Sequence, residues 1–141
     1  MSALFEHSPW VEERAASRRH ADLMAVLYAA TPEEQLGLIR AHPELAGKAA
    51  VDGTLTEASA AEQASAGLDR LTQGEFDRFH ALNSAYREKF DFPFIICVRL
   101  TDKAGILSAM EQRLSNDRDT EIATALEQIG EIVRLRLKDM A

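Results

Sequence analysis

The sequence predicts an all-α fold, a single-domain bundle of about six to eight helices with one extended segment. Helix-start motifs recur along the chain, and apolar residues repeat at helical spacing through most of it. Only residues 90–100, FDFPFIICVRL, are apolar without that spacing, and Pro93 interrupts them, so this segment is predicted to be extended. A chain of 141 residues suffices for one domain with a sizeable core, and we assign residues 1–141 to it.

The first two helices are predicted from capping signals and prolines. The first begins after the motif HSPW, residues 7–10, and continues to about Tyr28. The second begins at Thr31, which forms a capping box with Glu34. It ends before Pro43, because the residue that precedes a proline is disfavoured in helical geometry.

The remaining helices follow the same signals. Thr56 caps the helix EASAAEQASAGL, which closes at Gly67. Thr72 opens another helix through a second capping box. Two final helices are predicted over about 103–115 and 118–140, the last with one apolar stripe.

Charge and cysteine content exclude several classes of protein. The formal net charge is -7 and the pI is about 5.1, which argues against binding to nucleic acid or to an anionic membrane surface. The single cysteine, Cys97, excludes an intramolecular disulfide and any multi-cysteine metal site. No signal peptide and no membrane-spanning run are visible, so we expect a soluble cytoplasmic protein.

His42 is the first candidate for chemistry. It lies directly before Pro43, where the predicted helix has to stop. Local sequence alone favours a structural cap or surface residue, as for His20 and His80 on amphipathic helices. The break at Pro43 nevertheless directs the imidazole away from its own helix. His7, before the first helix, is open to a structural or a pocket role.

A polar face on the third predicted helix is the second candidate. Ser59, Glu62 and Gln63 are three and four residues apart, so they share one side of the helix. This face is either solvated surface or, if another element packs against the surrounding alanines, a site for a polar ligand.

The extended segment is the third candidate. Its irregular backbone suits a pocket wall, and Arg99 at its end is a forked donor for a carboxylate or ureido oxygen. An extended core segment with an exposed arginine is equally compatible. Cys97 is predicted to be a small buried residue rather than a nucleophile. No histidine pair has metal-ligand spacing, and no glycine-rich phosphate loop occurs.

Four motifs in order give these features a common interpretation. They are FEHSPWV, AHPELAGK, SAAEQASAGL and LNSAYREKFDFPFIICVR. Together they resemble the 2-oxo-4-hydroxy-4-carboxy-5-ureidoimidazoline (OHCU) decarboxylase family of uric acid breakdown, over nearly the whole chain. One departure is Asp91, where the family pattern FGFPF has glycine.

The resemblance implies a carboxy-lyase that uses no cofactor and no metal. It would convert OHCU, a small-molecule substrate, into (S)-allantoin and CO₂ in purine catabolism. The resemblance also implies a homodimer and functional coupling to hydroxyisourate hydrolase and urate oxidase.

Site residues are carried over by position from the matching motifs. His42 corresponds to the catalytic histidine, and Glu62 to the carboxylate that supports it. The implied substrate-binding residues are Pro43, Ser59, Gln63, Phe94, Ile95, Ile96 and Arg99. A histidine held by a carboxylate suits the substrate hydroxyl, whose proton it can take as an enol collapses to a carbonyl.

Two other functions compete with this assignment. A related decarboxylase or hydrolase would act on another ureido acid, and substrate competition separates the two. A non-catalytic helical interaction domain would turn over no OHCU. It would lose partner binding when exposed apolar residues, rather than His42, are changed.

Overall fold

The computed structural model describes residues 4–5, 8–17, 19–42, 45 and 57–140. Within them it contains seven α-helices, one 3₁₀ helix and no strand, which confirms the predicted all-α class. The elements are α1 (Trp10–Ala15), α2 (His20–Ala29), α3 (Pro32–Ala41), α5 (Glu57–Ser65), α6 (Gln73–Phe90), η1 (Val98–Leu100), α7 (Lys103–Arg113) and α8 (Arg118–Met140).

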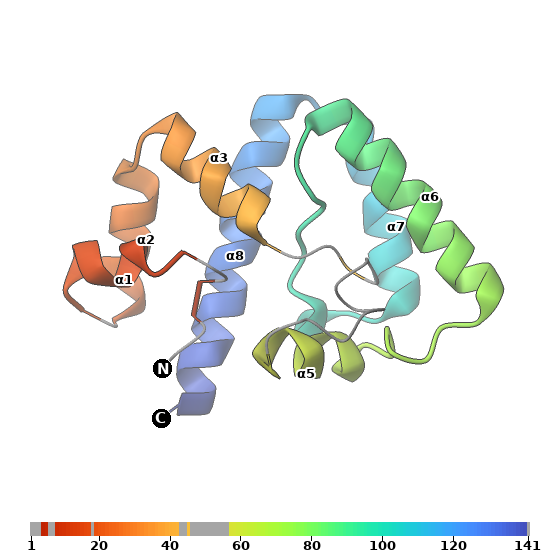
Figure 1. The fold of residues 1–141 in the computed structure, drawn as a ribbon, viewed down its shortest axis with the longest axis horizontal. Coiled ribbons are helices and arrows are strands. Elements are labelled where there is room, and N and C mark those ends of the chain that lie inside the picture. Colours follow the sequence, from red (N-terminus) through yellow and green to blue (C-terminus); the bar gives the residue numbers. More distant parts are fainter. Residues whose placement is uncertain (1–3, 6–7, 18, 43–44, 46–56, 141) are drawn as a thin grey trace.

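The long helix α8 forms the middle of the molecule (Figure 1). Helices α1, α2 and α3 lie on one side of it, and α5, α6 and α7 lie on the other. Both α2 and α3 contact α8, α6 contacts α7, and α5 contacts η1. The last helix therefore connects the two halves of the chain.

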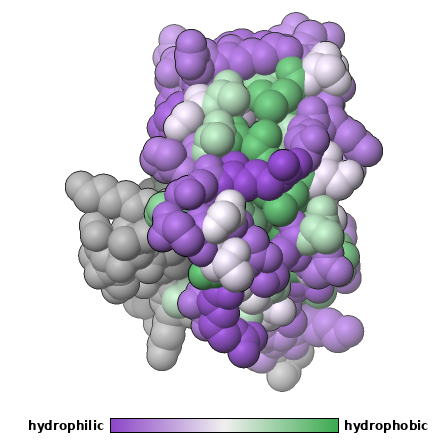
Figure 2. All heavy atoms as spheres, turned by 90° about the vertical axis from the view of Figure 1, so that its right-hand side faces the viewer, coloured by the Kyte–Doolittle hydropathy of each residue, from purple (hydrophilic) through white to green (hydrophobic). Residues whose placement is uncertain are grey.

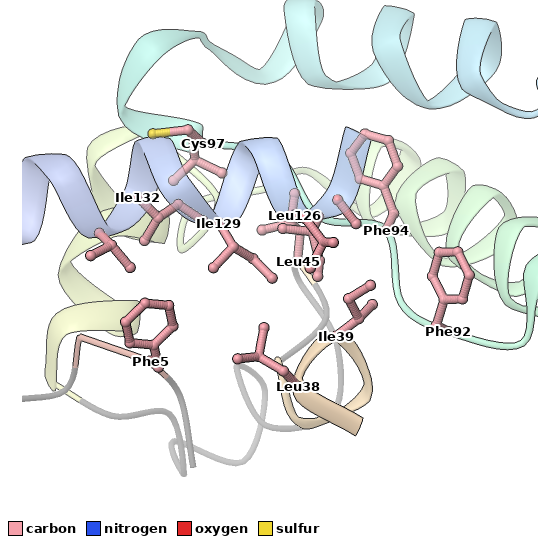
Figure 3. Close-up of a cluster of buried hydrophobic side chains, with 14 of the residues drawn as sticks. Phe5, Leu38, Ile39, Leu45, Phe92, Phe94, Cys97, Leu126, Ile129 and Ile132 are labelled. Carbon is pink, nitrogen blue, oxygen red and sulfur yellow. The ribbon is translucent and has the colours of Figure 1, made fainter. Parts of the chain in front are cut away.

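The hydrophobic core surrounds α8 (Figure 3). Side chains from the first half of the chain, such as Phe5 and Leu38, lie on the same side of α8 as Ile129. Phe92 and other residues of the extended segment complete the cluster. These side chains are almost fully buried, so the core is assembled from segments far apart in sequence.

The predicted first helix is wrong in one respect: it is two helices. Ala16 ends α1 in the left-handed conformation, with φ 51°. Ser17 then forms local bonds, because its hydroxyl accepts the Arg19 N–H at 3.1 Å and donates to Asp22 at 2.7 Å. Serine side chains compete with helical backbone hydrogen bonds in this way. The spacing of apolar residues does not reveal this competition, so the break could not be predicted from it.

Other helix boundaries agree with the capping analysis. Thr31 and Thr72 each cap a helix through a complete capping box, at the start of α3 and α6. Gly67 has the positive φ of 79° expected where a helix closes. Helix α7 ends at Arg113, slightly before the predicted boundary. Thr56 lies outside the described residues.

One face of helix α6 packs on the core and the other faces solvent. Its buried residues are Phe79, Asn83, Tyr86 and Phe90, at helical spacing, while Asp77 is exposed. Figure 2 views the molecule from the side of α6 and α7 and shows a strip of hydrophobic residues bordered by hydrophilic ones. In the part of the chain that the structure describes, no helix is both long and apolar enough to cross a bilayer.

Candidate active site

A pocket of about 320 Å³, counting its open mouth, lies where α3, α5, η1 and α8 meet. Its lining residues are His42, Leu45, Ser59, Glu62, Gln63, Ile96, Cys97, Val98, Arg99 and Ile132. Six of the residues expected from the sequence are therefore brought together here.

His42 reaches this pocket because α3 ends one residue before it. Its backbone is extended, with φ −74° and ψ 136°, and its N–H donates to the Ile39 carbonyl at 3.1 Å. The side chain is half-buried. Pro43 lies outside the described residues. The helix end predicted from the sequence thus places an imidazole in the pocket.

The polar face of α5 is buried rather than solvated. Ser59 and Gln63 are 3% and 6% exposed, and the Glu62 side chain is 12% exposed. All three line the same pocket as His42. This face is therefore not solvated surface.

Glu62 forms an ion pair with Arg136 of α8. Arg136 donates from Nε to Glu62 Oε2 at 2.8 Å and from Nη2 to Glu62 Oε1 at 2.7 Å. The Arg136 Nη2 also donates to the Ser59 hydroxyl at 3.3 Å, and Nη1 donates to the Leu4 carbonyl. This two-bond geometry fixes both side chains and offsets the charge of the carboxylate in the pocket.

Arg99 also lines the pocket, and it lies on η1 rather than on extended backbone. Its two terminal nitrogens donate to the Asp139 carboxylate at 2.7 and 3.2 Å. This pair is more exposed than the Glu62 pair, at 31% for the arginine and 59% for the aspartate. The pocket is thus bordered by two ion pairs, both completed by the C-terminal part of α8.

Two expected binding residues lie elsewhere. Phe94 and Ile95 are each 1% exposed and do not line the pocket. The Phe94 ring packs against Tyr86, and the Ile95 carbonyl accepts a hydrogen bond from Arg113. Ile96, the next residue, does line the pocket.

Cys97 lines the pocket as a buried thiol that is 2% exposed. Burial raises the pKa of this thiol above its ordinary value, and the nearby Glu62 carboxylate raises it further. The thiol is therefore protonated and uncharged at neutral pH, so Cys97 packs like a small apolar residue. This agrees with the expectation from its apolar sequence context.

Arg136 was not among the site residues expected from the sequence. The signal was present, because Ile129, Ile132 and Val133 precede Arg136 at core-facing spacing on α8. A charged residue on such a stripe is rarely buried without a partner. Its burial therefore requires a carboxylate elsewhere, but periodicity cannot identify that carboxylate as Glu62.

The arrangement combines an acid–base group with fixed polar partners. His42 can exchange a proton, Ser59 and Gln63 can hydrogen-bond a ligand, and the Glu62–Arg136 pair supplies oriented charge. Among the residues described, no three histidine, cysteine or acidic side chains are grouped to hold a metal ion.

Comparison with known proteins identifies the family. Residues 1–138 match the family model described as OHCU decarboxylase. The chain is 40% identical to a Haloferax volcanii OHCU decarboxylase, over 96% of this chain and 83% of that protein. It is 38% identical to a Bacillus subtilis uric acid degradation bifunctional protein, covering 99% of this chain but only 29% of that one.

A solved structure shows the same fold. The structure is that of an (S)-allantoin synthase, which is 30% identical to this chain and superposes with a TM-score of 0.72. The match covers 96% of this chain and 46% of that one. The sequence motifs, the helical fold and these matches agree, and the chain belongs to the OHCU decarboxylase family.

Proposed function

We propose that this protein decarboxylates OHCU to (S)-allantoin and CO₂. The observation that carries the proposal is the shared pocket of His42, Ser59, Glu62 and Gln63 in a chain of this family. The names of similar proteins support this substrate and this product, since they include OHCU decarboxylase and (S)-allantoin synthase.

The chemistry requires charge placement and one directed proton. When the carbon–carbon bond to the carboxylate breaks, CO₂ leaves and its electron pair forms a double bond between the two adjoining ring carbons. The C=N double bond at the ureido-bearing carbon opens at the same time, and its nitrogen takes up a proton, which gives an enol. The hydroxyl then loses its proton as the carbonyl forms, and the neighbouring carbon gains a proton on one face. A protein accelerates this by orienting the carboxylate and by stabilising the developing charge.

We assign the proton of the hydroxyl to His42. A histidine imidazole has one nitrogen that can accept a proton and can later return it. Glu62 orients the imidazole or the substrate hydroxyl. Both Glu62 oxygens accept from Arg136, and each retains a second lone pair for such a contact.

Substrate contacts are assigned to the remaining pocket residues. Ser59, Gln63, Ile96 and Arg99 line the pocket, and Arg99 offers its guanidinium to the anionic or ureido group. Arg99 is bound to Asp139 through its terminal nitrogens, which leaves its Nε edge unused by Asp139. The binding roles of Pro43, Phe94 and Ile95 stay predictions that rest on the family motif.

The test is a chirality assay with OHCU generated by urate oxidase and hydroxyisourate hydrolase. His42→Ala and His42→Asn should remove the accelerated formation of optically active allantoin, followed by circular dichroism, because uncatalysed decay gives racemate. His80→Ala is the matched control, since this histidine is exposed on α6. Near wild-type enantioselective rates in a folded His42→Ala protein would contradict the assignment.

We also propose a cytoplasmic homodimer that is functionally coupled to these two pathway enzymes. The Bacillus subtilis relative is named as bifunctional in uric acid degradation, which supports the coupling. Sedimentation equilibrium tests the dimer, and a monomer at assay concentration would reject it.

A further inference from the structure

The pocket wall is formed by a segment that lacks regular hydrogen bonding. Residues 91–97 are neither helical nor paired as a strand, and η1 follows directly. Backbone N–H and C=O groups that are buried outside helices and sheets need other partners. Two side chains from neighbouring helices supply them on either side of Ile96.

Gln128 of α8 holds one of these groups, and Arg113 of α7 holds the other. The Cys97 N–H donates to Gln128 Oε1 at 2.9 Å, and Arg113 Nη1 donates to the Ile95 carbonyl at 2.7 Å. In extended backbone, the C=O of one residue and the N–H two residues later point to the same edge. Both bonds therefore fix the same edge of the segment, around Ile96.

The Gln128 bond lies within the part of the segment that lines the pocket. Four consecutive residues, Ile96 to Arg99, line the pocket. Cys97 is also the residue from which η1 starts, and η1 carries Arg99. A displacement at the Cys97 amide would therefore move both the wall and the guanidinium.

Gln128 shares a face of α8 with two residues at the pocket. Gln128, Ile132 and Arg136 are four residues apart, so they lie along one face of the helix. Ile132 lines the pocket, and Arg136 binds Glu62. One face of α8 therefore contacts the wall segment, the pocket interior and the α5 carboxylate in succession.

We infer that Gln128 is a positioning residue for the decarboxylation, acting through the Cys97 N–H on the wall from Ile96 to Arg99. This inference rests on the proposed function. It assigns to Gln128 no contact with substrate, only the placement of groups that make such contacts.

The experiment compares two substitutions of Gln128 with opposite hydrogen-bonding capacity. Gln128→Leu removes the acceptor at similar size, and Gln128→Glu keeps an acceptor oxygen at the same position. We expect Gln128→Leu to raise KM for OHCU about tenfold with a small change in kcat. Misplaced binding groups weaken the binding of substrate and transition state alike, which raises KM and leaves kcat nearly unchanged. Gln128→Glu should restore KM to near the wild-type value.

Gln112→Leu is the matched control, because it removes an exposed glutamine from α7. A purely structural role for Gln128 would lower Tm without this split between KM and kcat. Unchanged KM in Gln128→Leu, or no rescue by Gln128→Glu, overturns the inference.

Amide hydrogen exchange at Cys97 gives a readout that does not depend on turnover. We expect fast exchange in Gln128→Leu and slow exchange in the wild type and in Gln128→Glu. Equal exchange in all three proteins rejects the hydrogen bond itself. If the wild type does not accelerate OHCU loss, the proposed function fails, whereas an active wild type with unchanged KM in Gln128→Leu rejects only the positioning role.

Discussion

Two buried arginine–glutamate pairs in this molecule have similar bonding in different surroundings. Glu62 and Arg136 meet at the pocket, with the carboxylate side chain 12% exposed. Glu121 and Arg113 meet in the core between α6, α7 and α8, with the carboxylate completely buried. Both arginines also donate to a backbone carbonyl.

The core pair has its partners within the protein. The Glu121 carboxylate accepts from Tyr86 Oη at 2.6 Å, from Arg113 Nε at 2.7 Å and from Asn116 Nδ2 at 2.8 Å. The Arg113 guanidinium stacks 4.3 Å from the centre of the Phe94 ring. Burial raises the pKa of Tyr86, and its hydrogen bond to Glu121 raises it further, so the phenol remains a donor.

The pocket pair instead borders open space. Glu62 and Ser59, both bonded to Arg136, line a pocket together with His42. A buried ion pair is therefore not evidence for an active site by itself, because the core pair satisfies the same description. The neighbouring groups and the adjoining space distinguish the two, and the same Glu→Gln substitution tests the distinction.

Glu62→Gln should have the largest effect on activity. Glutamine keeps the shape of the side chain but removes the charge that faces Arg136, so the electrostatics of the pocket change. We expect kcat/KM for OHCU to fall on the order of 10²-fold, less than for loss of His42, to which the proposed function assigns the proton transfer. Chirality-detected turnover is the measurement. Activity equal to or above wild type would remove Glu62 from the mechanism.

Glu121→Gln should mainly affect stability. The variant leaves Arg113 buried without a compensating charge. The glutamine NH₂ group would also face the donors that now bind the Glu121 carboxylate. Breaking a buried pair in this way costs about 3–5 kcal/mol, a large part of the stability of an ordinary domain. Urea unfolding measures this loss.

Activity completes the contrast between the two substitutions. The kcat/KM of folded Glu121→Gln protein should change much less than that of Glu62→Gln. If Glu121→Gln lost activity while keeping wild-type unfolding free energy, the separation between a structural and a functional pair would be wrong.

The sequence was sufficient to predict features that depend on local chemistry. Both capping boxes, the helix end at His42 and the shared face of Ser59 and Gln63 depend on residues a few positions apart. The left-handed break at Ala16 was not predicted, because alanine is a strong helix former and the serine bonds that compete with the helix leave no apolar signal.

Long-range partners were beyond prediction from sequence. Arg136 lies 74 residues from Glu62, and Asp139 lies 40 residues from Arg99, so only the fold defines which charges meet. The backbone conformation of Asp91 and its contact with Arg40 could not be predicted from the sequence either. It adopts the left-handed conformation that favours glycine, with φ 64°, and Arg40 binds its carboxylate and its carbonyl.

Glu34→Gln should have the smallest effect of the three, because this pair is on the surface. Glu34 accepts from Arg14 at 2.6 and 3.1 Å and from the Thr31 N–H at 3.1 Å. The Arg14 hydrogen bonds, followed by the bond from the Thr31 N–H, lower the pKa of Glu34 to about 2. We expect a slightly lower Tm at neutral pH and unchanged activity, since exposed pairs contribute little.

The pH dependence of this difference tests its cause. The folded-state pKa lies below the ordinary value of 4.5, so the carboxylate stabilises the fold above pH 4.5 and loses this effect as pH falls through about 2. The Tm difference between wild type and Glu34→Gln should therefore shrink between pH 5 and pH 2.5. Glu33→Gln, on the same helical turn, is the matched control. A difference that stays constant across this range would show that charge on Glu34 contributes nothing.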